Sequence, residues 1–87
     1  MYTLIFGRNF AASAEKLEQR LKIKLGRSLD ILQQEPFHPT LHSKPLTGPL
    51  TGFYSFRLGR DYRVIFQFVE GKPIILLRVK PRDQAYK

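Results

Sequence analysis

The sequence predicts an α+β fold in which an N-terminal strand and a helical segment pack on one face of a small twisted antiparallel sheet. Two patterns support this prediction. Apolar residues recur at intervals of three and four between Phe10 and Leu32, as they do on one face of a helix. In the last third of the chain, three strand-like runs are separated by short turns. We expect one domain over residues 1–87, a length that supports only a limited core.

The first half of the chain contains the expected first strand and the helical segment. Residues 2–6 are a short β-branched and aromatic run, and Asn9 is the candidate N-cap of a segment over residues 10–34. Gly26 either bends this segment or divides it into two helices, and both outcomes fit the pattern. Pro36 ends it. The apolar stripe comprises Phe10, Ala14, Leu17, Leu21, Leu25, Leu29 and Leu32.

Three strands are expected at residues 53–58, 62–69 and 73–80. The connections at 59–61 and 70–72 are short enough to form hairpins, so these strands run antiparallel in a meander. Because successive side chains point to opposite faces, the helical stripe is expected to cover the more apolar face. That face is predicted to comprise Tyr54, Phe56, Leu58, Tyr62, Val64, Phe66, Phe68, Ile75, Leu77 and Val79.

The opposite face of the sheet is expected to collect basic side chains. The third strand also contributes Ile74 and Leu76 to this face by the same alternation. Arginines gathered on one face with little acid nearby indicate a surface shaped for phosphate, because guanidinium groups pair bidentately with phosphate oxygens. The cations assigned to this face are Arg57, Arg63, Arg78, Lys80 and, just beyond the last strand, Arg82.

The formal net charge of +8 is unevenly distributed along the chain. Residues 1–43 hold six Lys and Arg against four Asp and Glu, whereas residues 44–87 hold nine against three. A small basic domain favours polyanions, of which nucleic acid is the commonest, although an acidic protein would satisfy the same field. No apolar stretch approaches the roughly 20 residues of a membrane-spanning helix, and residues 1–6 do not resemble a signal peptide. Without cysteine there is no disulfide framework, and we expect a cytoplasmic protein with no membrane partner.

Residues 35–52 form a Pro-rich connection that is long for a compact domain, and such loops are often functional. His38 and His42 lie four residues apart within it, but no cysteine or carboxylate cluster accompanies them. We therefore expect no metal site and no cofactor. Lys44 is a candidate phosphate contact.

Two motifs in the second half, in this order and spacing, resemble the RelE/ParE toxin superfamily. The block KPLTGPLTGFYSFRL at 44–58 is similar to the family pattern pLkGkLkGlyrirv, and RDYRVIF at 60–66 is similar to gdYRvvy. The order of strand, helical segment, Pro-His-Pro loop and a tail ending in RDQAY extends the resemblance over essentially the whole chain. Its members are small bacterial toxins of type II toxin–antitoxin systems, so the resemblance implies a RelE-like fold.

In the RelE-like branch, the resemblance implies a metal-independent endoribonuclease that cuts messenger RNA in the ribosomal A site. The ribose 2′-hydroxyl attacks the adjacent phosphate. Arg63 matches the family arginine that contacts the scissile phosphate, and Arg57 and Arg82 match further basic positions. Tyr86 matches a late tyrosine that stacks on a base or assists proton transfer.

The resemblance leaves the general base open. Many family members carry a histidine near Lys80-Pro81-Arg82, and this chain has none there. Lys80 is a candidate base if like charges on Arg78 and Arg82 favour its neutral form. Tyr86 either acts on the RNA or anchors the C-terminus. The candidate catalytic residues are Arg57, Arg63, Lys80, Arg82 and Tyr86, and the candidate RNA contacts are Lys44, Arg60 and Arg78.

The resemblance leaves two other functions open. One is a ParE-like inhibitor of DNA gyrase, which needs no residues for phosphate cleavage, and the other is a degenerate member that only binds an antitoxin or RNA. Retention of Arg63, Arg82 and Tyr86 favours the nuclease, so inhibition of translation by mRNA cleavage is the expected function. The expected partners are mRNA and ribosomal RNA in the A site, and a cognate antitoxin whose acidic, partly disordered segment folds across the basic face.

Overall fold

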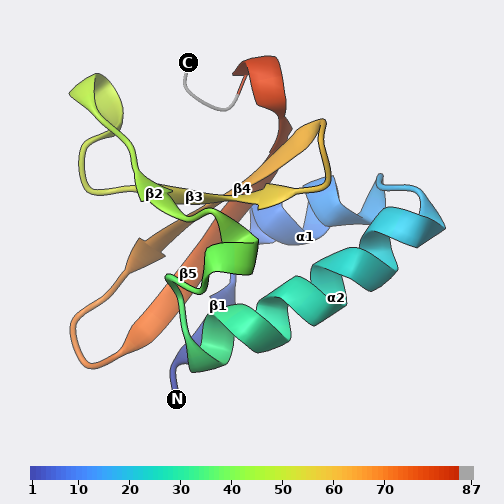
Figure 1. The fold of residues 1–87 in the computed structure, drawn as a ribbon. Coiled ribbons are helices and arrows are strands. Elements are labelled where there is room, and N and C mark those ends of the chain that lie inside the picture. Colours follow the sequence, from blue (N-terminus) through green and yellow to red (C-terminus); the bar gives the residue numbers. More distant parts are fainter. Residues whose placement is uncertain (85–87) are drawn as a thin grey trace.

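A computed structural model describes residues 1–84, in which two helices lie together on one side of a five-stranded sheet (Figure 1). The predicted α+β class and its one-sided helical layer are confirmed. The helices are α1 (Arg8–Glu15) and α2 (Gln19–Gln34). The strands are β1 (Thr3–Phe6), β2 (Lys44–Pro45), β3 (Tyr54–Leu58), β4 (Tyr62–Phe68) and β5 (Pro73–Pro81). Three short 3-10 turns are η1 (Pro39–Leu41), η2 (Gly48–Leu50) and η3 (Arg82–Gln84).

The strands are arranged in the order β1-β5-β4-β3-β2. The three long strands form the expected antiparallel meander, and β2 adds a two-residue antiparallel edge beside β3. β1 pairs with β5 in the parallel direction, so the sheet is mixed rather than wholly antiparallel. The first strand of the chain therefore lies beside the last one.

The first helix begins earlier than the sequence predicts. Gly7 is the N-cap of α1, so the assignment of Asn9 as the cap is wrong. The Gly7 N–H donates to the Leu76 carbonyl oxygen at 2.9 Å, which fastens the end of β1 to β5 where α1 starts. A Cβ at Gly7 would lie only 2.8 Å from that oxygen, so this close approach requires glycine.

The helical segment is divided in two at residues 16–18, and Gly26 lies inside α2. The Leu17 N–H donates to the Ala14 carbonyl oxygen at 3.1 Å, which closes α1 and leaves Leu17 buried. The segment is therefore divided near this buried leucine and not at the glycine. α2 ends before Pro36, as expected.

The main core lies between the helices and the sheet. The apolar stripe of both helices packs there against the predicted apolar faces of β3 and β4. Fully burying one Val, Leu, Ile or Phe side chain contributes about 1.5–3 kcal/mol to the stability of the fold. No helix within residues 1–84 has the length and apolar character to cross a membrane. The buried core residues are Phe10, Leu17, Leu25, Leu32, Leu41, Phe56, Leu58, Val64, Phe66, Ile74, Leu76 and Val79.

The face assignment of β5 differs from the prediction over the first part of the strand. Ile74 and Leu76 are fully buried under the helices, although the alternation placed them on the opposite face. Ile75 and Leu77 are only half-buried and lie on the face away from the helices, so their assignment to the core is wrong. Val79 is buried in the core, as predicted.

A β-bulge explains this change of face. Phe66 of β4 pairs with Leu76, whereas the preceding Ile65 pairs with Arg78. Leu77 is therefore an extra residue in β5 that opposes no residue of its own in β4. One extra residue reverses the alternation, so the positions before the bulge face the other way from the sequence prediction.

Beyond the end of β1, the Ser13 hydroxyl of α1 takes the place of a strand partner for β5. The Val79 N–H donates to Ser13 Oγ at 2.9 Å, and the same hydroxyl donates to the backbone carbonyl of Asn9. This bond joins α1 to the part of β5 that carries the basic side chains. The contact fixes the position of residues 78–80 relative to the helical layer.

Gly7 at the start of α1 and Gly26 within α2 make a matched test of this fold. Gly7→Ala is expected to lower the free energy of unfolding by about 1–3 kcal/mol, because the new methyl group meets the Leu76 carbonyl. Gly26→Ala should raise it by about 0.5–1 kcal/mol, since nothing lies within 4 Å of the added Cβ and alanine favours the helix. Urea unfolding followed by circular dichroism measures both. Equal effects of the two substitutions would contradict this account of Gly7.

Candidate functional site

Three cations form a row across the open face of the sheet, which the helices leave uncovered. Arg57 of β3 is the register partner of Arg63 of β4, and Arg63 is in turn the partner of Lys80 of β5. Residues directly opposite each other in a sheet have Cβ atoms about 4.5–5.5 Å apart. We call Arg57, Arg63 and Lys80 the basic row. Like charges directly opposite destabilise a sheet, so this row opposes folding unless an anion lies between the charges.

Four arginines line a recess of about 310 Å³ at the end of the basic row, next to the turn between β3 and β4. We call this the arginine recess, and its lining residues are Arg57, Gly59, Arg60, Arg63 and Arg82. Strand register places Arg57 and Arg63 side by side, and the turn itself carries Arg60. Arg82 comes from η3, and its backbone N–H donates to the Asp61 carbonyl oxygen at 2.7 Å. That bond holds the start of η3 against the turn.

Arg63 is the most buried of these arginines, with 8% of its surface exposed. Its Nη1 donates to the Tyr62 carbonyl oxygen at 2.9 Å. Within residues 1–84, the ion pairs join Arg20 to Glu18 and Lys22 to Glu15, all in the helical layer. No carboxylate of that part of the chain therefore pairs with the recess arginines. A charge withdrawn from water without a counter-ion is costly, so the recess favours an anion from outside.

The arginine recess suits a phosphodiester in particular. The guanidinium group is planar, always charged, and matches two phosphate oxygens with two parallel N–H donors. The structure brings Arg57, Arg63 and Arg82 to one place, and Arg60 joins them. A phosphate in the recess would meet cations on several sides.

The other expected site residues lie around this centre. Lys80 is half-buried at the far end of the basic row, and Arg78 is exposed near Asn9 of α1. Lys44 lies on β2, where it lines a separate recess beside η2. Tyr86 lies outside the described residues.

The two histidines of the long connection serve the backbone. His38 Nδ1 accepts a hydrogen bond from the Thr40 N–H at 3.1 Å and caps η1, and His42 takes the left-handed conformation at its end. Within the part of the chain that the structure describes, no group of three or more His, Cys, Asp or Glu side chains could hold a metal ion.

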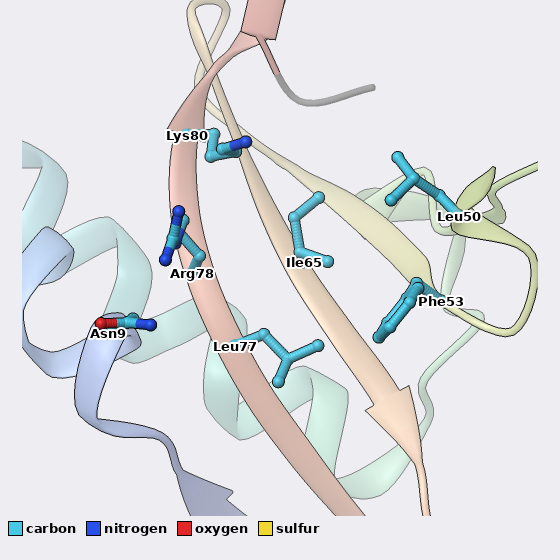
Figure 2. A pocket seen from close by; sticks show the side chains of 7 residues that line it. All are labelled: Asn9, Leu50, Phe53, Ile65, Leu77, Arg78 and Lys80. Carbon is cyan, nitrogen blue, oxygen red and sulfur yellow. The ribbon is translucent and has the colours of Figure 1, made fainter. Parts of the chain in front are cut away.

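An apolar groove of about 300 Å³ adjoins the basic row on the same face (Figure 2). Leu77 and Ile65 project from β5 and β4 into it, and Phe53 and Leu50 face them from the segment that contains η2. Lys80 also points over the groove from β5. The full lining is Asn9, Leu50, Phe53, Ile65, Leu77, Arg78 and Lys80.

Sequence reasoning missed this groove because it assigned Leu77 to the core. A signal was present in residues 74–77, which are four consecutive apolar residues. Strict alternation of a one-sided strand does not give such a run, and a bulge within it is one of the ways to accommodate it.

The sequence matches the model of a known protein family. Residues 4–86 match the model of the "ParE toxin of type II toxin-antitoxin system, parDE". The chain therefore belongs to this toxin family, within the RelE/ParE superfamily. A search of curated proteins finds no match.

Solved structures of toxins share the fold. A chain in the archaeal RelE–RelB complex from Pyrococcus horikoshii OT3 is 30% identical, with 97% of this chain and 98% of that chain covered and a TM-score of 0.80. A chain of the toxin–antitoxin complex RelBE2 from Mycobacterium tuberculosis is 28% identical, with 93% and 98% covered and a TM-score of 0.72. YafQ from E. coli strain BL21(DE3) matches over 100% of both chains with a TM-score of 0.80 but 14% identity, which is a similarity of fold alone.

Removing one charge from the basic row should stabilise the protein. Arg57→Gln is expected to raise the free energy of unfolding by about 0.2–1 kcal/mol at low salt, because it relieves repulsion with Arg63. The gain should shrink as salt screens the charges. Arg27→Gln on α2 removes an equal charge far from the row and is the matched control. Urea unfolding at several salt concentrations measures the effect, and an equal gain from both substitutions would show that only net charge matters.

Proposed function

We propose that this toxin is an endoribonuclease that cleaves messenger RNA in the ribosomal A site by attack of the ribose 2′-hydroxyl on the adjacent phosphate. The arginine recess is the single observation that carries this proposal, because it offers several cations to one phosphodiester and no carboxylate of residues 1–84 pairs with them. The similarity to a RelE toxin supports the same reading.

The reaction concentrates negative charge on the phosphate. Attack by the 2′-oxygen forms a pentacoordinate phosphorane, and cleavage then leaves a 2′,3′-cyclic phosphate and a free 5′-oxygen. Arg63 is preorganised for this charge, because burial and its bond to the Tyr62 carbonyl hold it in place. Arg57 and Arg82 share the task. A preorganised donor of this kind contributes about 3–4 kcal/mol to transition-state stabilisation.

Two proton transfers complete the balance of the reaction. One proton leaves the 2′-hydroxyl, and one is delivered to the departing 5′-oxygen. Lys80 is the proposed base, since the basic row places it beside Arg63. Tyr86 is the proposed second group, either as an acid or by stacking on a base.

The proposed partners are RNA and a cognate antitoxin. Contacts to mRNA and to ribosomal RNA are assigned to Lys44, Arg60 and Arg78 in addition to the recess. The similar structures from P. horikoshii and M. tuberculosis are toxin–antitoxin complexes, which supports an antitoxin for this chain. A net charge of +8 favours an acidic neutralising segment across the open face.

Substitution of Arg63 tests the proposal. Arg63→Ala is expected to lower the rate of mRNA cleavage about 100- to 1,000-fold and to relieve growth arrest, because it removes the central donor to the phosphate. Toeprinting of mRNA on translating ribosomes measures cleavage in the A site. Arg57→Ala is the companion variant, since its side chain is exposed and its loss leaves the core intact. Arg27→Ala on α2 is the control, and a folded Arg63→Ala protein with full activity would refute the proposed site.

Inhibition of DNA gyrase is the second candidate, favoured by the family model that carries the ParE name. Such an inhibitor would act by binding and would not need the basic row for cleavage. A gyrase supercoiling assay separates the two functions. We expect supercoiling to proceed normally with the purified toxin, and inhibition that survives Arg63→Ala would establish the second candidate instead.

A further inference from the structure

We propose that the apolar groove beside the basic row is a nucleobase subsite, which receives an unstacked base of the nucleotide next to the phosphate held in the arginine recess. This inference rests on the proposed function and adds a base-recognition element that is distinct from Tyr86. It concerns the groove lined by Leu50, Phe53, Ile65 and Leu77.

The position of the groove relative to the recess is the first argument. Arg63 and Ile65 are two residues apart on β4, so both face the open side of the sheet. Two residues of strand span about 6.6–6.8 Å, which is comparable with the reach from a backbone phosphate to its own base. A nucleotide whose phosphate meets Arg63 can therefore lay its base over Ile65.

The chemistry of the groove is the second argument. Single-stranded RNA is recognised through unstacked bases that lie on aromatic and apolar side chains. Phe53 and Leu77 are half-buried, so each keeps apolar surface available to a flat ligand. Ile65 is 8% exposed and closes the floor, and a recess of about 300 Å³ admits a single base.

The rim of the groove is the third argument. Lys80 belongs both to the groove and to the basic row, where it is the register partner of Arg63, so it lies between the recess arginine and the groove. Arg78 and Asn9 lie on the same side of the groove as Lys80, across from Leu50 and Phe53 (Figure 2), and both can donate hydrogen bonds to a base edge. Asn9 is available for this because Gly7, rather than Asn9, caps α1.

The β-bulge gives the groove its shape. Leu76 and Val79 are three residues apart and both face the core, which strict alternation does not allow without an extra residue between them. The same extra residue lets Leu77 face Ile65 and Phe53. Bulges are over-represented beside active sites, where they re-aim a side chain. Here the bulge turns one leucine out of the core and onto the surface that carries the cations.

A base-deletion cycle tests this subsite. The probe is a 2′-fluoro RNA trinucleotide, which lacks the attacking hydroxyl, together with versions that lack each base in turn. For the full-length wild-type toxin at low salt, loss of one particular base should weaken binding about 5- to 150-fold. The Phe53→Ala and Leu77→Ala variants should bind the intact probe more weakly and lose most of that base dependence. Ile23→Ala, an exposed apolar position on α2, is the matched control and should behave as wild type.

The outcomes separate the subsite from the proposed function. The sugar–phosphate probe without any base should still bind in a way that depends on Arg63. If it does so and no base deletion changes the affinity, the subsite is wrong and the phosphate site stands. If the base dependence persists unchanged in Phe53→Ala and Leu77→Ala, the base lies elsewhere and the subsite is again overturned, leaving the groove to an apolar protein segment. Failure of every probe to bind would reject the subsite and the phosphate site together.

Discussion

The central physical constraint in this protein is a set of like charges that the strand register forces together. Arg57, Arg63 and Lys80 are direct partners across three strands, and each of these strands contributes apolar side chains to the core on its other face. Moving any strand by one residue would separate the cations, but it would also turn the core residues toward water. Hydrophobic packing on one face therefore maintains electrostatic repulsion on the other. An anion between these cations would relieve the repulsion.

Two hydrogen bonds and a β-bulge position the rest of the site. The bond from the Arg82 N–H to the Asp61 carbonyl brings the chain after β5 back to the turn between β3 and β4. The bond from the Val79 N–H to Ser13 ties the same strand to α1. The bulge at Leu77 changes the face of β5 between its core-forming start and its basic end. The end of β5, which carries basic side chains, is therefore held both by α1 and by the neighbouring strands of the sheet.

The sequence was sufficient for the fold class, the strand meander and the helical stripe, because each follows from local periodicity. The spacing of leucines in the helices and the turns at 59–61 and 70–72 are short-range signals. The faces of β3 and β4 followed as well, since neither strand contains an extra residue. The convergence of Arg57 and Arg63 could be anticipated for the same reason: both alternate regularly in paired strands.

The remaining features depend on tertiary contacts that periodicity does not contain. Gly7 caps α1 because β1 must pass within hydrogen-bonding distance of Leu76, and that contact joins residues far apart in the chain. The bulge depends on how β5 fits between β4 and the helices, so the alternation rule placed Leu77 on the wrong face. The apolar groove was missed in consequence. A crystal structure of the toxin with a non-cleavable 2′-fluoro dinucleotide tests the central claim most directly. The account predicts the phosphate in the arginine recess, in contact with Arg63 and at least one of Arg57 and Arg82. A phosphate bound elsewhere, with these arginines turned away from it, would contradict the account.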